Sequence, residues 1–306
     1  MIRARALSFS YARQEKGIDD IYLEVPDGSC FGLLGQNGAG KSTLMKLILG
    51  LLKPKQGEVF LQKQMLNKAG VSLYKEVGAL VESPALYTHL SAYDNLSINS
   101  IYRGIIQSRI EEVLERVALN AYAHQKVSTY STGMKQRLGI ALALLHDPKL
   151  LILDEPVNGL DPEGIVTIRK LIRSLQQEGK TILLSSHLLH EIELSCDYVG
   201  ILQEGKLLYQ GRIKDLQQQN YAHQPLCIKT NDNIKARQLL SGAKFFCQQD
   251  ENGLLINIEN KDQISVIIDL LRAQQIAIYK ITQQEARLED LYFRFTKTHQ
   301  HEVIKR

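Results

Sequence analysis

Short apolar runs alternate with helical stretches along the first 216 residues. Three of the runs, Phe31–Leu34, Leu150–Leu153 and Thr181–Leu184, have the length of strands. Apolar runs separated by helical segments predict parallel strands that are buried on both faces. Ile201–Gln203 and Lys206–Tyr209 predict a closing hairpin. The predicted helices are Leu44–Leu52, Ile110–Ala118, Met134–Leu145, Ile165–Gln177 and Leu188–Cys196.

The pattern changes after a glutamine-rich stretch at 217–219, which predicts a linker. The elements beyond it follow the order β-α-β-β-α-β, the split form of a ferredoxin-like domain. They are a strand at Leu226–Lys229, a helix at Asn233–Leu240, strands at Lys244–Cys247 and Leu254–Ile258, a helix at Asp262–Leu271 and a strand at Ile276–Ile281, with a last helix near Glu285–Phe295. The sequence therefore predicts an α/β domain over residues 1–216 and a small α+β domain over residues 217–306.

Composition limits the classes of function. A length of 306 residues suggests about two domains. The net charge of +4 is spread along the chain without a Lys/Arg block, so nucleic acid is not an expected partner. The four cysteines are scattered, and neither a disulfide nor a zinc site is expected. No apolar run reaches the ~20 residues that span a bilayer. If the protein serves transport, a separate chain is expected to form the pore.

One glycine-rich segment matches the phosphate-loop pattern G-x-x-x-x-G-K-[ST], between an apolar strand and an apolar helix. Backbone N–H groups of such a loop point inward and, with the helix N-terminus, bind phosphate oxygens. The lysine adds a positive charge, and the serine hydroxyl can ligate Mg²⁺. A flexible glycine turn is the alternative interpretation, which the strand–turn–helix context disfavours. The segment consists of Gly35, Gln36, Asn37, Gly38, Ala39, Gly40, Lys41, Ser42 and Thr43.

Polar residues also follow two other predicted strands. Asp154 and Glu155 come directly after Leu150–Leu153, and His187 follows the strand at Thr181. The carboxyl ends of parallel strands are where open α/β sheets bind ligands. Asp154 is predicted to hold Mg²⁺ with Ser42, and Glu155 to deprotonate the attacking water. His187 could hydrogen-bond the γ-phosphate. An Asp-Glu pair alone is more often a solvated turn, but its order behind a phosphate loop favours catalysis.

These motifs, together with Tyr130-Ser-Thr-Gly-Met-Lys-Gln-Arg137, resemble the ATP-binding-cassette (ABC) ATPases. The segment is similar to their LSGGQ-x-x-R signature, with Thr and Met at two variant positions. The resemblance implies that Ser131 and Gly133 bind the γ-phosphate of a nucleotide held by a partner subunit. Ser131 also suits the N-cap of a helix, and both interpretations can hold together.

The resemblance covers residues 1–216 and implies further roles. Tyr11 lies where the family has an aromatic that stacks on adenine, and Asp161 in a loop that crosses a dimer interface. Glu82 stands where glutamine is usual, and a carboxylate there could sense Mg²⁺ or the attacking water. The segments Glu82–Tyr87 and Tyr93–Leu96 are similar to bacitracin-resistance and lantibiotic-immunity exporters.

The resemblance implies two cassettes, identical chains or paralogues, that sandwich ATP. It also implies a membrane permease that contacts the segment from Glu82 to about Arg103. The expected location is cytoplasmic, peripheral on the membrane's cytoplasmic face, and the expected activity is ATP hydrolysis that drives export of an antimicrobial peptide, drug or lipid. The alternatives are a non-transport cassette acting on ribosomes or nucleic acid, a small-molecule kinase or GTPase, and an importer subunit.

Overall fold

The structure is a computed structural model that describes residues 1–11, 17–68, 70–219, 225–250, 253–258, 260, 262–283, 288–289 and 291–296. The chain divides into two compact units. The first comprises Met1–Ile213 and Phe295–Arg306, and the second Lys214–Arg294.

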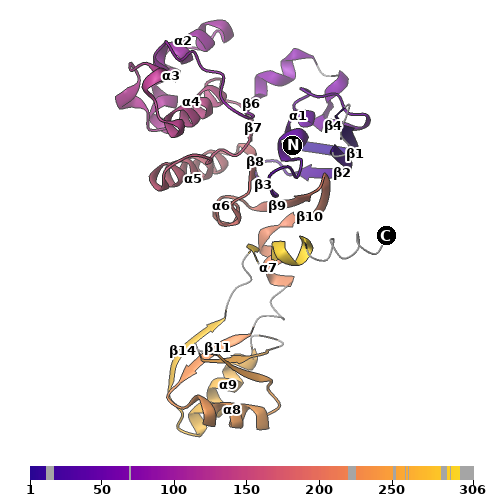
Figure 1. Ribbon diagram of the computed structural model, residues 1–306, viewed down its shortest axis with the longest axis vertical. Coiled ribbons are helices and arrows are strands. Elements are labelled where there is room, and N and C mark those ends of the chain that lie inside the picture. The colour runs from indigo at the N-terminus through magenta and orange to yellow at the C-terminus, as the bar shows by residue number, and fades with distance from the viewer. Residues whose placement is uncertain are drawn as a thin grey trace. The chain divides into compact units, whose positions relative to one another are not determined.

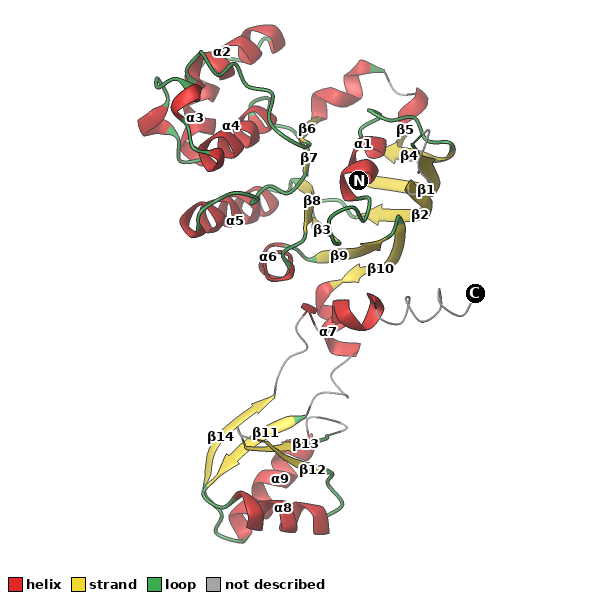
Figure 2. Cartoon of the chain, in the orientation of Figure 1, coloured by secondary structure: helices red, strands yellow, loops and turns green. Residues whose placement is uncertain are grey.

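A six-stranded sheet forms the centre of the first unit (Figures 1 and 2). Its order is β10-β9-β3-β8-β7-β6; β10 runs antiparallel to β9, and the other neighbouring pairs are parallel. β3, β7 and β8 are buried along their whole length, as predicted for strands covered on both faces. The strands are β3 (Cys30–Leu34), β6 (Val77–Leu80), β7 (Leu150–Leu153), β8 (Thr181–Ser186), β9 (Tyr198–Gln203) and β10 (Lys206–Arg212).

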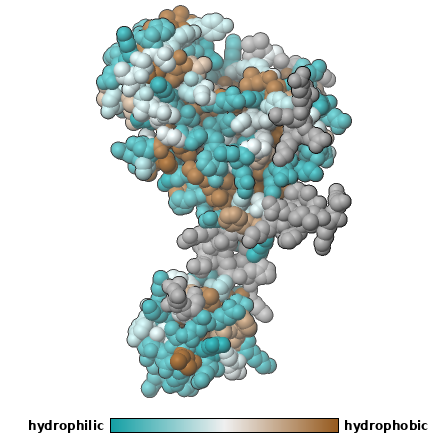
Figure 3. All heavy atoms as spheres, viewed as in Figure 1, coloured by the Kyte–Doolittle hydropathy of each residue, from teal (hydrophilic) through white to brown (hydrophobic). Residues whose placement is uncertain are grey.

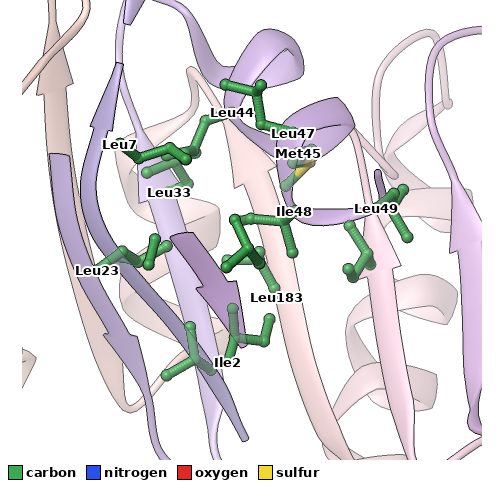
Figure 4. Close-up of a cluster of buried hydrophobic side chains, with 14 of the residues drawn as sticks. Ile2, Leu7, Leu23, Leu33, Leu44, Met45, Leu47, Ile48, Leu49 and Leu183 are labelled. Atoms are coloured by element: carbon green, nitrogen blue, oxygen red, sulfur yellow. The ribbon is translucent and has the colours of Figure 1, made fainter. Parts of the chain in front are cut away.

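A second, antiparallel sheet has the order β2-β1-β4-β5 and was not predicted. Helix α1 (Lys41–Ile48) lies between the two sheets, and Figure 4 shows its Leu44, Met45 and Ile48 among leucines of both. Burying these side chains on two sides anchors the start of α1. The strands are β1 (Ile2–Ser10), β2 (Gly17–Val25), β4 (Gln56–Leu61) and β5 (Gln64–Met65).

Three helices form a group beside the parallel sheet (Figure 1): α2 (Ala92–Arg103), α3 (Ser108–Arg116) and α4 (Thr132–Leu144). Helix α2 was not predicted, although Ser91 and Asp94 form a capping box at its start. Arg109 of α3 pairs with Asp147, which also accepts a hydrogen bond from Lys180. Helices α5 (Pro162–Gln177) and α6 (Leu189–Ser195) lie on the side of the sheet away from α1 in Figure 1. Short 3₁₀ turns occupy Leu66–Lys68, Val71–Glu76, Asn120–Tyr122 and Val127–Thr129.

The second unit has the predicted β-α-β-β-α-β order, with the antiparallel strand order β12-β13-β11-β14. Two predicted strands are displaced. The strand predicted at Ile276–Ile281 lies two residues later, at Ile278–Gln283. The strand predicted at 244–247 begins only at Cys247. The reason is that α8 closes with Lys244 in the left-handed region (φ +69°) and Phe245 N–H bonded to Leu240 O. The elements are β11 (Leu226–Thr230), α8 (Asn233–Gly242), β12 (Cys247–Asp250), β13 (Gly253–Ile256), α9 (Asp262–Ala273) and β14 (Ile278–Gln283).

The glutamine-rich stretch is not an irregular linker, because residues 217–219 end a helix, α7 (Ile213–Gln219). The predicted helices of the first unit are confirmed, with starts that differ by one to three residues. Of the predicted terminal helix, residues 288–289 and 291–296 are helical, and 285–287 and 290 lie outside the described residues.

Candidate functional site

The phosphate loop joins β3 to α1, as predicted. Gly38 and Gly40 have φ values of +82° and +106°, a region that glycine adopts without steric cost. A Cβ added to Gly35 would lie 2.5 Å from the carbonyl oxygen of Leu202, so the β9–β10 hairpin supports the loop. Gln36, Asn37 and Gly38 are exposed, whereas Ala39 is buried. The loop therefore presents its backbone to solvent just before the N-terminus of α1.

Lys41 is buried, with 7% of its side chain exposed. Its ammonium donates to the carbonyl oxygens of Gly35 at 2.7 Å and Gln36 at 3.3 Å, and lies 3.2 Å from Glu155 Oε1. A buried ammonium is tolerated only when it is paired and hydrogen-bonded. The loop carbonyls and one carboxylate therefore hold this charge at the mouth of the phosphate loop.

Asp154 and Glu155 leave the C-terminal end of β7 next to Ser185 of β8. The Ser185 hydroxyl donates to Asp154 Oδ1 at 2.6 Å and accepts from the Glu155 N–H at 2.8 Å. Asp154 is 5% exposed and Ser185 is fully buried. Sequence reasoning missed Ser185, because a serine inside a buried strand gives no signal that its partners lie 30 residues away.

The Glu155 carboxylate lies between two nitrogen groups. Its Oε1 faces Lys41, and its Oε2 lies 2.9 Å from His187 Nδ1. The Glu155 backbone has a φ of +46°, and its carbonyl accepts a 3.3 Å hydrogen bond from Gln136 Nε2. The structure thus brings the predicted base, the phosphate lysine and the predicted histidine sensor into one cluster.

The predicted metal ligands Ser42 and Asp154 provide a suitable donor set. Ser42 is the second residue of α1, and Asp154 lies at the end of β7. A hydroxyl and a carboxylate are hard oxygen donors of the kind that Mg²⁺ prefers. Ser185 occupies one carboxylate oxygen of Asp154, so a cation would take the other.

Glu82, the third predicted metal residue, is paired elsewhere. Its carboxylate accepts a 2.5 Å hydrogen bond from Lys46 of α1, and this contact is the main cause that raises the pKa of the Lys46 ammonium. Asp154 contributes more weakly to the same shift. Glu82 is 63% exposed and has a φ of +63°. The structure therefore links Glu82 to the phosphate-loop helix through Lys46.

Tyr11 is 39% exposed. Its hydroxyl lies 3.3 Å from Thr43 Oγ1 of α1, and its ring packs edge-on against Phe9. An exposed ring beside the phosphate-loop helix suits stacking on a base.

Ser131 caps α4, and its hydroxyl accepts the Met134 N–H at 3.2 Å. Gly133 packs on the loop before α5, where an added Cβ would lie 3.0 Å from Leu160 Cδ2. Asp161 caps α5 by accepting the Gly164 N–H. The signature-like turn and the predicted interface loop are therefore neighbours, while Figure 1 shows α4 and α1 on opposite sides of β6–β8.

A groove of about 340 Å³ lies between the central sheet and the helical group. Ala79 of β6 lines one side of the groove together with Leu51 and Tyr74. Asn99 and Arg103 of α2 line the other side. His146 also lines the groove, and burial lowers the pKa of its imidazole. Apolar side chains at Leu51, Ile101 and Tyr102 are 65–90% exposed, and Figure 3 shows apolar surface at the α2 end.

In the part of the chain that the structure describes, none of the helices combines the length and apolarity needed to span a bilayer.

Comparisons with known proteins agree with this geometry. A family model described as "ABC transporter" matches residues 18–158. The bacitracin transport ATP-binding protein BcrA of Bacillus licheniformis is 40% identical over 298 residues, 95% of this chain and 96% of that protein. The lantibiotic transport ATP-binding protein SrtF of Streptococcus pyogenes is 40% identical over 208 residues, 68% of this chain and 89% of that protein. A dimeric post-hydrolysis ATP-binding cassette bound to ADP and Pi has a TM-score of 0.64 at 25% identity, covering 70% of this chain and 99% of that one.

Proposed function

The chain belongs to the family of ABC transporter ATP-binding proteins, and from this premise we propose that two such chains hydrolyse ATP between them to drive export through a separate permease. The observation that carries the proposal is the Glu155 carboxylate held between Lys41 and His187 at the mouth of the phosphate loop.

The cluster suggests how the chain's own residues act. A bound triphosphate would give Lys41 phosphate oxygens in place of Glu155, which frees this carboxylate for the attacking water. Glu155 would take a proton from the attacking water. The water oxygen would then bond to the γ-phosphorus while the bond between that phosphorus and the β–γ bridging oxygen breaks. His187 would hydrogen-bond the γ-phosphate. Mg²⁺, held by Ser42 and Asp154, would neutralise charge on the β- and γ-phosphate oxygens.

Two chains are needed because the proposed phosphate-binding groups lie apart within one. Gly133 lies beside Gly159 and Leu160, and in Figure 1 its helix α4 lies across strands β6–β8 from α1. Paired face to face, each signature-like turn would meet the partner's nucleotide. A dimeric cassette bound to ADP and Pi among the similar structures supports the pairing of two chains. We propose a dimer of identical chains or of this chain with a paralogue.

The groove beside α2 is the proposed contact for the permease. Its apolar rim suits a short helix of a membrane protein, and Arg103 adds a positive charge. This contact would place the chain peripherally on the cytoplasmic face of the membrane. Because BcrA and SrtF are named for bacitracin and lantibiotic transport, the proposed substrate is an antimicrobial peptide, drug or lipid.

The shared site can be tested with Glu155→Gln, which keeps the size of the side chain but removes the base. Phosphate release should fall by about 10²–10⁴-fold, while MgATP still binds and gel filtration shows a trapped dimer. Adding Gly133→Asp should abolish the ATP-dependent dimer, because a carboxylate would face the partner's γ-phosphate, and each monomer should still bind MgATP.

Gly242→Asp is the matched control, since an added Cβ at Gly242 meets no atom within 4 Å in the second unit; it should leave the dimer intact. Native turnover in Glu155→Gln would reject the base assignment. A dimer that survives Gly133→Asp would reject the shared site.

A further inference from the structure

We propose that Ser185 is a positioning residue that fixes both carboxylates of the site, Asp154 for the metal and Glu155 for the water. The inference rests on the proposed function in taking Asp154 as a metal ligand. Ser185 would act through these two residues, which it contacts directly.

Sheet register places Ser185 at the centre of the site. It lies opposite Leu33 of β3, two residues before the phosphate loop begins. On the other side Leu184 pairs with Leu153 of β7, so Ser185 adjoins Asp154 where β7 ends. The residue is fully buried on a central strand, and its hydroxyl therefore has little freedom to move.

The direction of each hydrogen bond follows from the donors. The Glu155 N–H can only donate, so the Ser185 oxygen accepts it at 2.8 Å. The single hydroxyl proton is then available for Asp154 Oδ1 at 2.6 Å. A carboxylate oxygen is a strong acceptor for this proton. The hydrogen bond commits one oxygen and restricts rotation of the carboxylate, which orients the other oxygen for a cation.

The second bond acts on the base. Glu155 has a φ of +46°, a conformation that non-glycine residues adopt only at an energetic cost. Ser185 holds the N–H side of this residue, and Asn158 N–H and Gln136 Nε2 hold its carbonyl. Without the Ser185 hydroxyl, the Glu155 N–H would lose this hydrogen bond. The Glu155 carboxylate would then lose its fixed position near Lys41 and His187.

Ser185→Ala tests the proposal, because alanine is smaller and retains the strand. In EDTA, where the phosphate loop alone binds ADP, the affinity for ADP should stay within twofold of wild type. The affinity of the ADP complex for Mg²⁺, measured by calorimetry, should fall about 10–100-fold, as expected for loss of a group that orients a metal ligand. The kcat for ATP should fall over the same range with little change in the ATP KM. Ser185→Thr, which retains a hydroxyl, should recover most of both losses.

Ser100→Ala is the matched control. Ser100 is 1% exposed, and its hydroxyl donates to Ile105 O at 2.6 Å in the helical group. Its loss should leave Mg²⁺ affinity unchanged. The proposal is overturned if Mg²⁺ affinity and kcat of Ser185→Ala stay within twofold of wild type. It is also overturned if the affinity for ADP in EDTA falls by the same factor as the affinity for Mg²⁺. These titrations need no dimer, so failure of the shared site would appear in the Gly133→Asp experiment and not here.

Discussion

The two units of the chain bury different kinds of side chain. The first encloses Lys41, Asp154, Ser185 and Ser186 together at one edge of its parallel sheet. Within the described part of Lys214–Arg294, Thr230 is the one polar residue in the buried set, and its hydroxyl bonds to Asn233 beside it. The core of the second unit is otherwise made of residues such as Leu226, Leu240, Leu254 and Ile267.

The difference in buried side chains distinguishes the unit that carries the reaction from the unit whose buried residues serve only its own stability. Burying a charge costs free energy unless it is paired and hydrogen-bonded, and the first unit has a partner for each of its buried charges. The second unit gains hydrophobic burial without such a cost. Buried polar groups therefore locate the reaction in the first unit, whereas the apolar packing of the second unit explains its fold.

The largest expected effect is on stability. Leu254→Ala in the full chain should destabilise the second unit by about 2–5 kcal/mol through lost contacts and a cavity. Hydrogen exchange should accelerate in β11 and β13, while MgATP affinity stays unchanged. Leu183→Ala in β8 is the matched substitution, since both leucines are fully buried; it should accelerate exchange in β7 and β8. Weaker MgATP binding by the Leu254 variant would contradict the assignment of nucleotide binding to the first unit alone.

Lys41→Ala should weaken nucleotide binding by about 1.5–3 kcal/mol, the range of a charged hydrogen bond, or about 10–100-fold in Kd. Calorimetry with MgATP measures the change. Lys149→Ala is the control, because Lys149 is 73% exposed and pairs with Glu76 away from the phosphate loop. An unaltered affinity in the Lys41 variant would count against the phosphate-loop assignment.

The smallest effect should come from the Lys46–Glu82 pair at the rim of the site. A double-mutant cycle with Lys46→Gln and Glu82→Gln should give a coupling of about 0.2–1 kcal/mol in the free energy of unfolding, because Glu82 is largely exposed. The pKa of Lys46 is raised above its ordinary 10.5, so the coupling should persist below pH 10.5 and fade as pH rises through the folded-state pKa. A coupling of several kcal/mol would place this pair with the buried charges.

Local pattern predicted much of this structure. Each of the strands β3, β7 and β8 is one continuous apolar run, and the motif around Lys41 is also continuous in sequence. These elements could therefore be predicted from residues adjacent in the chain. Strand β1 could not be derived as simply. Ile2 and Ala4 are buried and Arg3 and Arg5 exposed, but the register shifts before Leu7, which breaks the alternation.

The missed contacts share one property, which is that they join residues far apart in sequence. Ser185 meets Asp154 across two strands, and Lys46 meets Glu82 across 36 residues. Such pairs depend on strand order and register, which a single sequence leaves open. The roles of Tyr11, Ser131, Gly133 and Asp161 toward nucleotide remain predictions.

The position of β3 also constrains when this protein becomes functional during its synthesis. Both neighbours of β3, β8 and β9, come from residues 181–203, and Gly35 rests on the Leu202 carbonyl. The glycine-rich loop is therefore synthesised well before the strands that support it. We expect a nascent chain that ends before β9 to bind nucleotide weakly, because its glycine-rich loop lacks these supporting strands.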